Sequence, residues 1–185
     1  KDLIEEIVTF NGEEGNTDDA VDAMTQALNH LHGRTVDTYK AAMANAGVTL
    51  TMQAGRSVLI NNNVSTNNGA ISVTSNDPGA TLANRTAGAG SITMAAGTTL
   101  NAGNQNITLS TGNPVGGTPG DITARNLTTT GNIQLNSLNN VTLAGALNSG
   151  PGTVTINANT DGVGAQLFTM NAGSAITTTN ATAGA

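Results

Sequence analysis

The sequence predicts a mostly β fold, a right-handed parallel β-helix with coils of about 20–21 residues, preceded by a short α-helical segment at the N-terminus. Three observations lead to this prediction. Short pairs of apolar residues, each separated by one polar residue, recur at regular intervals after residue 48. The chain includes two Phe, one Tyr and no Trp, so a core must be thin and aliphatic. The apolar spacing over residues 1–47 is instead helical.

Charge divides the chain at the same place as the change of pattern. Residues 1–47 hold nine of the twelve acidic residues and three of the six basic ones, whereas the remainder is neutral and rich in Gly, Asn, Thr, Ala and Ser. We therefore expect two parts, an acidic helical segment over 1–47 and a β-helical repeat region over 48–185. Six basic residues argue against nucleic-acid binding, and we expect no membrane-spanning helix.

The acidic segment carries two helical patterns. Apolar residues spaced by three, four and three predict a helix from about Asp18 to His32: Val21, Met24, Leu28 and Leu31. A weaker pattern predicts a second short helix over residues 35–45, which ends before Gly47. The stretch from Leu3 to Phe10 is ambiguous between strand and helix. We expect that this segment can cap the first β-helical coil.

The repeat region changes to a period of two, which indicates half-buried strands. One row recurs at intervals of one coil length, with one member missing near Asn113: Leu50/Met52, Ile71/Val73, Ile92/Met94, Ile133/Leu135, Val154/Ile156 and then Ile176. A second row has nearly the same spacing: Ile107, Leu127, Leu147 and Leu167. A third row is less regular: Leu100, Ile122 and Leu143. Three rows predict about three short strands in each coil.

The segment over 113–120 occupies the missing place in the first row. It contains Pro114 and Pro119, which cannot donate a hydrogen bond to a β-ladder. We therefore expect the segment to loop out from one coil.

A stretch of the acidic segment that ends at Leu28, EEIVTFNGEEGNTDDAVDAMTQAL, resembles the C-terminal end of the nuclease domain of tailed-phage terminase large subunits. The resemblance implies a ribonuclease H-like nuclease that uses two divalent metals, Mg²⁺ or Mn²⁺, and Asp18 and Asp19 match a metal-binding pair. The family's other metal-binding acids come from earlier strands, which do not precede Lys1 in this sequence. Because two metals need more carboxylates than this pair, we expect no nuclease activity.

The repeat region resembles filamentous-haemagglutinin-type adhesins in the segments GSITMAAGTTLNAGNQNITLSTG, GNIQLNSLNNVTLAGALNS and PGTVTINA. The resemblance implies a right-handed β-helix that is exported by two-partner secretion to the bacterial surface or beyond, where it binds a host-surface or cell-surface ligand. The sequence shows no signal peptide or secretion module of that family. Because the terminal coils would leave strand edges open, we also expect self-association.

Residues with catalytic potential are sparse in the repeat region. Asp121 and Asp161 are separated by two coil lengths, so they could share a column at a carboxylate separation that suits glycoside hydrolysis, although coincidence explains the spacing better. Six Asn-x-Ser/Thr sequences are typical of N-glycosylation sites, but an Asn- and Thr-rich chain also produces them by chance: Asn63, Asn84, Asn106, Asn126, Asn140 and Asn180.

The sequence therefore predicts a non-enzymatic, extracellular structural or adhesive β-helix without catalytic residues or a cofactor. One alternative is a terminase nuclease remnant, in which Asp18 and Asp19 bind Mg²⁺ or Mn²⁺ in the cytoplasm of a phage-infected bacterium. Another alternative is a mosaic reading frame whose two parts share no single function.

Overall fold

The computed structural model describes residues 47–81, 83, 85, 88–113 and 117–182. This part of the chain contains fifteen β-strands and no α-helix. The predicted helices over 18–32 and 35–45, and the stretch from Leu3 to Phe10, lie outside the described residues. The predicted boundary near Gly47 and the proposed cap stay predictions.

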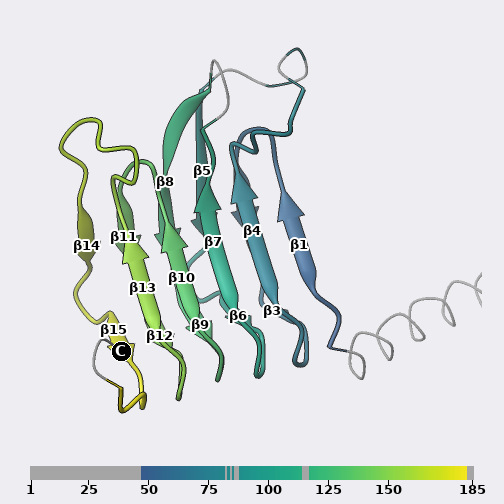
Figure 1. Ribbon diagram of the computed structural model, residues 1–185, viewed down its shortest axis with the longest axis vertical. Coiled ribbons are helices and arrows are strands. Elements are labelled where there is room, and N and C mark those ends of the chain that lie inside the picture. Colours follow the sequence, from purple (N-terminus) through teal and green to yellow (C-terminus); the bar gives the residue numbers. More distant parts are fainter. Residues whose placement is uncertain (1–46, 82, 84, 86–87, 114–116, 183–185) are drawn as a thin grey trace, which may run out of the picture. The chain divides into compact units, whose positions relative to one another are not determined.

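The strands form three parallel sheets of five strands each. Sheet A contains β1 (Leu50–Gln53), β4 (Ile71–Ser75), β7 (Ile107–Thr111), β10 (Ile133–Asn136) and β13 (Val154–Asn157), which lie side by side in Figure 1. Sheet B contains β2 (Val58–Ile60), β5 (Ala89–Met94), β8 (Thr118–Ala124), β11 (Val141–Leu143) and β14 (Phe168–Met170). Sheet C contains β3 (Val64–Ser65), β6 (Thr99–Asn101), β9 (Asn126–Thr128), β12 (Ala146–Asn148) and β15 (Ala175–Thr177).

The chain visits sheets A, B and C in turn before it returns to sheet A beside its previous strand. We call three consecutive strands, one from each sheet, a coil, so coil 1 is β1–β3 and coil 5 is β13–β15. The prediction of a mostly β fold with repeated parallel strands is confirmed, and the topology is consistent with a parallel β-helix.

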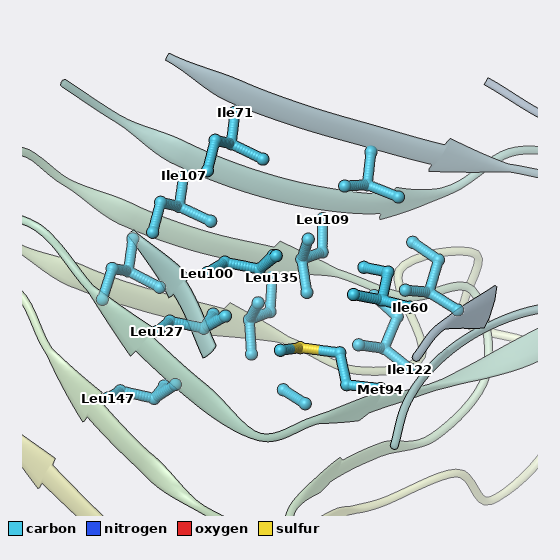
Figure 2. Close-up of a cluster of buried hydrophobic side chains, with 14 of the residues drawn as sticks. Ile60, Ile71, Met94, Leu100, Ile107, Leu109, Ile122, Leu127, Leu135 and Leu147 are labelled. Atoms are coloured by element: carbon cyan, nitrogen blue, oxygen red, sulfur yellow. The ribbon is translucent and has the colours of Figure 1, made fainter. Parts of the chain in front are cut away.

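The interior is filled by side chains that stack in register from coil to coil. In sheet A, Ile71 pairs with Ile107, which in turn pairs with Ile133, and all three are at most 1% exposed. Figure 2 shows an equivalent row from sheet C, in which Leu100, Leu127 and Leu147 follow one another. Because successive strand residues point to opposite faces, each short strand places one or two apolar side chains inside the coil.

The predicted constant spacing between coils is wrong for the inner coils. Leu50 pairs with Ile71, as the predicted spacing requires, but Ile71 pairs with Ile107, well beyond one predicted coil length. Ile92 and Met94, which the first predicted row included, belong to sheet B and pair there with β2. The segments that join the strands differ in length, and hydrogen bonding between neighbouring strands, rather than residue number, determines which side chains share a column.

Each of the two other predicted rows also combines residues that the structure places in different positions. Leu127 and Leu147 do share sheet C, and their row continues to Ile176. Leu167 instead precedes β14 and is 64% exposed, so it is not the next member. From the third row, Ile122 and Leu143 lie on the neighbouring strands β8 and β11 of sheet B, whereas Leu100 belongs to sheet C.

The segment over 113–120 does not loop out completely. Residues 114–116 lie outside the described part, but Thr118, Pro119 and Gly120 begin β8. Pro119 lies opposite Gly90, and the register between β5 and β8 shifts between Gly90 and Ile92. This irregularity accommodates a residue without an N–H group, because the ladder is already interrupted there.

Candidate functional site

Buried hydroxyl groups line the corner between sheets A and B. Ser75, Thr111 and Ser137 directly continue the inward-facing apolar positions of β4, β7 and β10. The Ser75 hydroxyl donates to the carbonyl of Gly90 at 2.9 Å, and the Ser137 hydroxyl donates to the carbonyl of Gly120 at 3.3 Å. Because buried carbonyl groups need hydrogen-bond partners, this hydroxyl column stabilises the bend of the chain.

A second column of hydroxyl groups lies where sheet C turns back to sheet A. Thr129 is 3% exposed, and its hydroxyl bonds to the carbonyl groups of Gly103, at 3.1 Å, and Gln105. The same oxygen accepts a bond of 2.9 Å from the N–H of Gly131. In the next coil, the buried Ser149 hydroxyl bonds to its own turn. In both coils, the position after the sheet C strand therefore supports a turn.

A ladder of polar side chains connects all five coils at the start of sheet B. The Ser57 hydroxyl accepts from the Ser91 N–H, and the Ser91 hydroxyl accepts from the Asp121 N–H, both at 3.2 Å. The Asp121 carboxylate accepts from the Asn140 N–H at 3.1 Å, and the Asn140 side-chain oxygen accepts from the Leu167 N–H at 2.9 Å. Each step joins one coil to the next, so these side chains have a structural role.

Asparagine forms a similar ladder at the start of sheet A. The Asn106 side-chain oxygen accepts from the Asn132 N–H, and that of Asn132 accepts from the Thr153 N–H, both at 2.9 Å. On the outward face of the same sheet, the Asn157 amide donates to Asn136 at 2.8 Å. Polar residues therefore stack on polar residues from coil to coil, as in other stacks of parallel strands.

Asn76 ties coils 1 to 3 together at the corner between sheets A and B. It is completely buried and has a φ of 54°, a conformation that asparagine tolerates better than most residues. Its amide donates to the carbonyls of Gly112, at 3.0 Å, and Thr118, at 3.2 Å, while its oxygen accepts from Arg85. Arg85 also donates to the carbonyl of Gly55 at 2.7 Å. One arginine and one asparagine thus hold the segment between β4 and β5 against its neighbours.

The outward faces of the sheets carry the remaining polar groups and form the candidate binding surface. In sheet B, four threonines occupy one register position on neighbouring strands: Thr93, Thr123, Thr142 and Thr169. We call these residues the threonine column. Sheet A presents two uncharged columns, which are Thr51, Ser72, Thr108, Gln134 and Thr155, and Gln53, Thr74, Ser110, Asn136 and Asn157. Strands repeat at about 4.8 Å, so each column offers evenly spaced hydrogen-bonding groups.

Asp121 and Asp161, the pair considered from the sequence, do not share a column. Asp121 lies in β8, and its column continues through Asn140 to Leu167. Asp161 lies between β13 and β14, where its carboxylate accepts from the N–H of Val163 at 3.1 Å. Because the connecting segments differ in length, a spacing of two predicted coil lengths does not bring the two carboxylates to the same position of their coils.

The predicted metal-binding pair, Asp18 and Asp19, lies outside the described residues. Within the described part of the chain, no group of three His, Cys, Asp or Glu residues is arranged to hold a metal ion. Nor does any helix of residues 47–182, within the described ranges, have the length and hydropathy that crossing a bilayer requires.

Most of the Asn-x-Ser/Thr sequences have a structural explanation. Asn106 and Asn140 belong to the ladders described above, and Asn63 and Asn126 accept from backbone N–H groups of the next coil at 2.9 and 3.1 Å. In each case an apolar inward residue and an outward Thr or Ser follow. The Asn-x-Ser/Thr sequence therefore corresponds to the start of a strand, with an asparagine that bonds to the next coil, an inward apolar residue and an outward hydroxyl residue. Asn84 lies outside the described residues.

Comparisons with protein-family models, with curated proteins and with solved structures gave no match to this chain.

Proposed function

We propose that residues 48–185 form a right-handed parallel β-helix that serves as a non-enzymatic structural or adhesive segment of a secreted or surface-held protein. The observation that carries this proposal is the register of uncharged hydroxyl and amide groups along the outward faces of sheets A and B. The aliphatic interior supports it, because an uninterrupted stack of buried residues gives the rigidity that a stalk needs.

The right-handed sense follows from the general handedness of parallel connections. Each strand of sheet A returns to the same sheet beside its predecessor after it has crossed sheets B and C. Connections between parallel neighbouring strands of one sheet are right-handed in about 98% of cases, because the strands twist in one direction. An experimental structure with coils of the opposite hand would contradict this part of the proposal.

The adhesive mechanism is weak hydrogen bonding repeated over several coils. A single exposed hydroxyl group binds its partner only slightly better than water does, but evenly spaced groups on a rigid support act together. The ligand class that suits such a surface is a neutral, polyhydroxylated polymer. Because the threonine column and the columns of sheet A carry no charge, we expect binding that depends little on ionic strength.

Binding of the full chain to neutral polysaccharides tests the adhesive role. Immobilised protein would be exposed to dextran and to mannan, with heparin as the charged comparison, at low and at high salt. The double variant Thr123→Val and Thr142→Val removes two hydroxyl groups from the middle of the threonine column and should weaken binding several-fold. The matched control, Thr128→Val on sheet C, should leave binding unchanged. Absence of binding to every polymer, or equal binding by both variants, would contradict the adhesive proposal.

The terminase-like alternative concerns Asp18 and Asp19, and a separate measurement addresses it. Under that alternative, the full chain with Mn²⁺ would cleave plasmid DNA, and the double variant Asp18→Ala and Asp19→Ala would not. Under our proposal, neither protein cleaves DNA. If the two parts belong to a mosaic reading frame, both measurements would be negative although the chain folds.

A further inference from the structure

The segment that joins β13 to β14 differs from its counterpart in the preceding coil (Figure 1). In coil 4, residues 137–140 make the corner between sheets A and B, and the side chains of Ser137, Asn139 and Asn140 all form hydrogen bonds there. In coil 5, residues 158–167 make the same corner, so the segment is longer and forms a loop. Insertions of this kind often carry the binding function of a repeat protein.

Two side-chain oxygens of this loop are buried and have no hydrogen-bond partner among the described residues. They are Oδ1 of Asn159 and Oε1 of Gln166. The Asn159 amide is oriented by its Nδ2, which donates to the carbonyl of Gly164 at 3.3 Å, so that Oδ1 faces away from this carbonyl. Buried oxygens without a donor are rare, because removal from water costs free energy that no bond repays. Both atoms are covered by the described residues themselves, so no neighbour beyond coil 5 is needed to bury them.

Gly164 is the residue against which both amides lie. Asn159 bonds to its carbonyl, as described above. A Cβ added to Gly164 would lie 2.5 Å from Nε2 and 2.8 Å from Oε1 of Gln166. The space that a side chain would fill at this position is therefore occupied by the Gln166 amide.

Asp161 adds a negative charge to the same loop. Its carboxylate accepts from the N–H of Val163, the residue that precedes Gly164, at 3.1 Å. Asp161 is the one charged residue of residues 151–182, so no Lys or Arg of this range neutralises it. Among the described residues, no hydrogen bond reaches the backbone carbonyls of residues 160–163, which are further oxygen acceptors.

A loop that gathers oxygen acceptors without donors calls for a cation. A buried water molecule donates only two hydrogen bonds, whereas a cation attracts every oxygen around it. Carboxylate, amide and backbone oxygens are the ligands that Ca²⁺ takes in flexible arrangements, while Mg²⁺ requires near-ideal octahedral geometry and keeps several of its waters. Residues 158–167 contain no His, Cys or Met, so the loop lacks the nitrogen and sulfur ligands of softer metals.

We propose that the loop over 158–167 binds one Ca²⁺ ion, with the Asp161 carboxylate, Asn159 Oδ1 and Gln166 Oε1 as its side-chain ligands. Backbone carbonyls of the loop and water complete the coordination. Because the site has a single carboxylate, we expect a dissociation constant of about 10⁻⁴–10⁻³ M, the range of extracellular calcium-binding modules. The inference does not depend on the adhesive role, so it can hold if polysaccharide binding fails.

Titration of the isotope-labelled full chain with CaCl₂, followed by NMR, tests the site. The amide signals of Gly162 and Gly164 should shift and saturate at millimolar Ca²⁺, whereas equal concentrations of MgCl₂ should have little effect. A local signal is needed because the acidic residues of segment 1–47 can also attract Ca²⁺. Glycine signals that do not move, or that respond equally to the two ions, would overturn the proposal.

Two substitutions that change charge in opposite directions separate binding from loss of structure. Asp161→Asn should weaken binding at least about tenfold, and Gln166→Glu should strengthen it about tenfold, because affinity follows the charge of the ligands. The matched control is Asp77→Asn, since the Asp77 carboxylate also accepts from a backbone N–H two residues later, at 3.0 Å from Gly79, and should leave the affinity unchanged. Without added Ca²⁺, Asp161→Asn should unfold at the same temperature as the original chain. Unchanged affinity in both loop variants would contradict the assigned ligands.

Two glycine substitutions test the position of Gln166. Gly162 and Gly164 both have a positive φ, of 68° and 88°, so alanine strains the backbone at either position. A Cβ at Gly162 meets no atom within 4 Å, whereas one at Gly164 displaces the Gln166 amide. Gly164→Ala should therefore abolish Ca²⁺ binding, and Gly162→Ala should retain it. Equal affinities of the two variants would exclude Gln166 from the site and overturn the proposal.

Discussion

Asn140 donates two hydrogen bonds to a single carboxylate oxygen of Asp121, one from its backbone N–H at 3.1 Å and one from its side-chain amide at 3.0 Å. The same oxygen accepts a third bond, of 2.6 Å, from the side chain of Asn139. These bonds join coil 3 to coil 4 at the start of sheet B. The acidic group that the sequence presents as a candidate for catalysis is therefore part of the ladder that holds the coils together.

Replacement of Asp121 by alanine should lower the free energy of unfolding by about 1–3 kcal/mol, because three donors lose a charged acceptor. Urea denaturation followed by circular dichroism measures the change. Asp161→Ala is the control, since that carboxylate accepts from its own turn and should change stability by less than about 0.5 kcal/mol. Equal effects of the two substitutions would mean that the ladder does not stabilise the stack.

Thr129→Val should destabilise the protein although the two side chains have nearly the same shape. The substitution leaves the Gly131 N–H and the Gln105 carbonyl without their hydroxyl partner, at a cost of about 1–3 kcal/mol, whereas the Gly103 carbonyl keeps its bond from the Thr130 N–H. The adjacent Thr128 is exposed and faces outward, so Thr128→Val should be within about 0.5 kcal/mol of the original chain. Thermal unfolding compares them, and a reversed order would contradict the corner assignment.

Truncation of an aliphatic side chain to alanine should cost more inside the stack than at its end. Leu147 is 1% exposed, and Leu147→Ala should lower stability by about 2–5 kcal/mol. Ile176 continues the same row but is 39% exposed in the monomer, so Ile176→Ala should cost clearly less at low protein concentration. Denaturation at a concentration where the protein is monomeric compares the two variants. Equal costs would mean that Ile176 is packed as tightly in solution as Leu147.

Gly120→Ala should destabilise coil 3, because an added Cβ would lie 2.5 Å from the backbone carbonyl of Gly90. The neighbouring strand cannot move without disturbing the β5 and β8 pairing. At Gly79, the nearest atom to an added Cβ is 3.5 Å away, so Gly79→Ala serves as the control and should be tolerated. Denaturant midpoints that do not differ between the variants would argue against the close approach of β5 and β8.

Repeated short parallel strands can be predicted from the sequence because alternation is a local property. In β4, β7 and β10, alternate residues are apolar and face inward, so the strands can be recognised without knowledge of their partners. Pairing is not local, and equal spacing is a poor guide to it. Equal spacing places Ile92 in the sheet A row, because it follows Ile71 at the interval that separates Ile71 from Leu50. In the structure, Ile92 pairs with Val58 in sheet B.

The sequence does contain a signal for the three inner strands of sheet A. The strands β4, β7 and β10 continue their alternation into a small hydroxyl residue, as in Ile71-x-Val73-x-Ser75 and Ile133-x-Leu135-x-Ser137, whereas β1 and β13 continue into Ala54 and Ala158. Ile92 and Met94 are followed instead by the alanines at 95 and 96, without such a hydroxyl. The distinction has a physical basis, because the hydroxyl satisfies carbonyls at the bend between sheets A and B.

The sequence by itself determined that residues 48–185 contain short strands with aliphatic inward faces and polar outward faces, because these properties depend on neighbouring residues only. Only the tertiary structure decided which strands pair, that Asp121 belongs to a ladder rather than to a carboxylate pair, and that Phe168, Met170 and Ile176 are left exposed. The reason is that the connecting segments differ in length, so the number of residues between two strands does not predict which of their positions pair. Hydrogen bonds between coils then determine the columns and the corners.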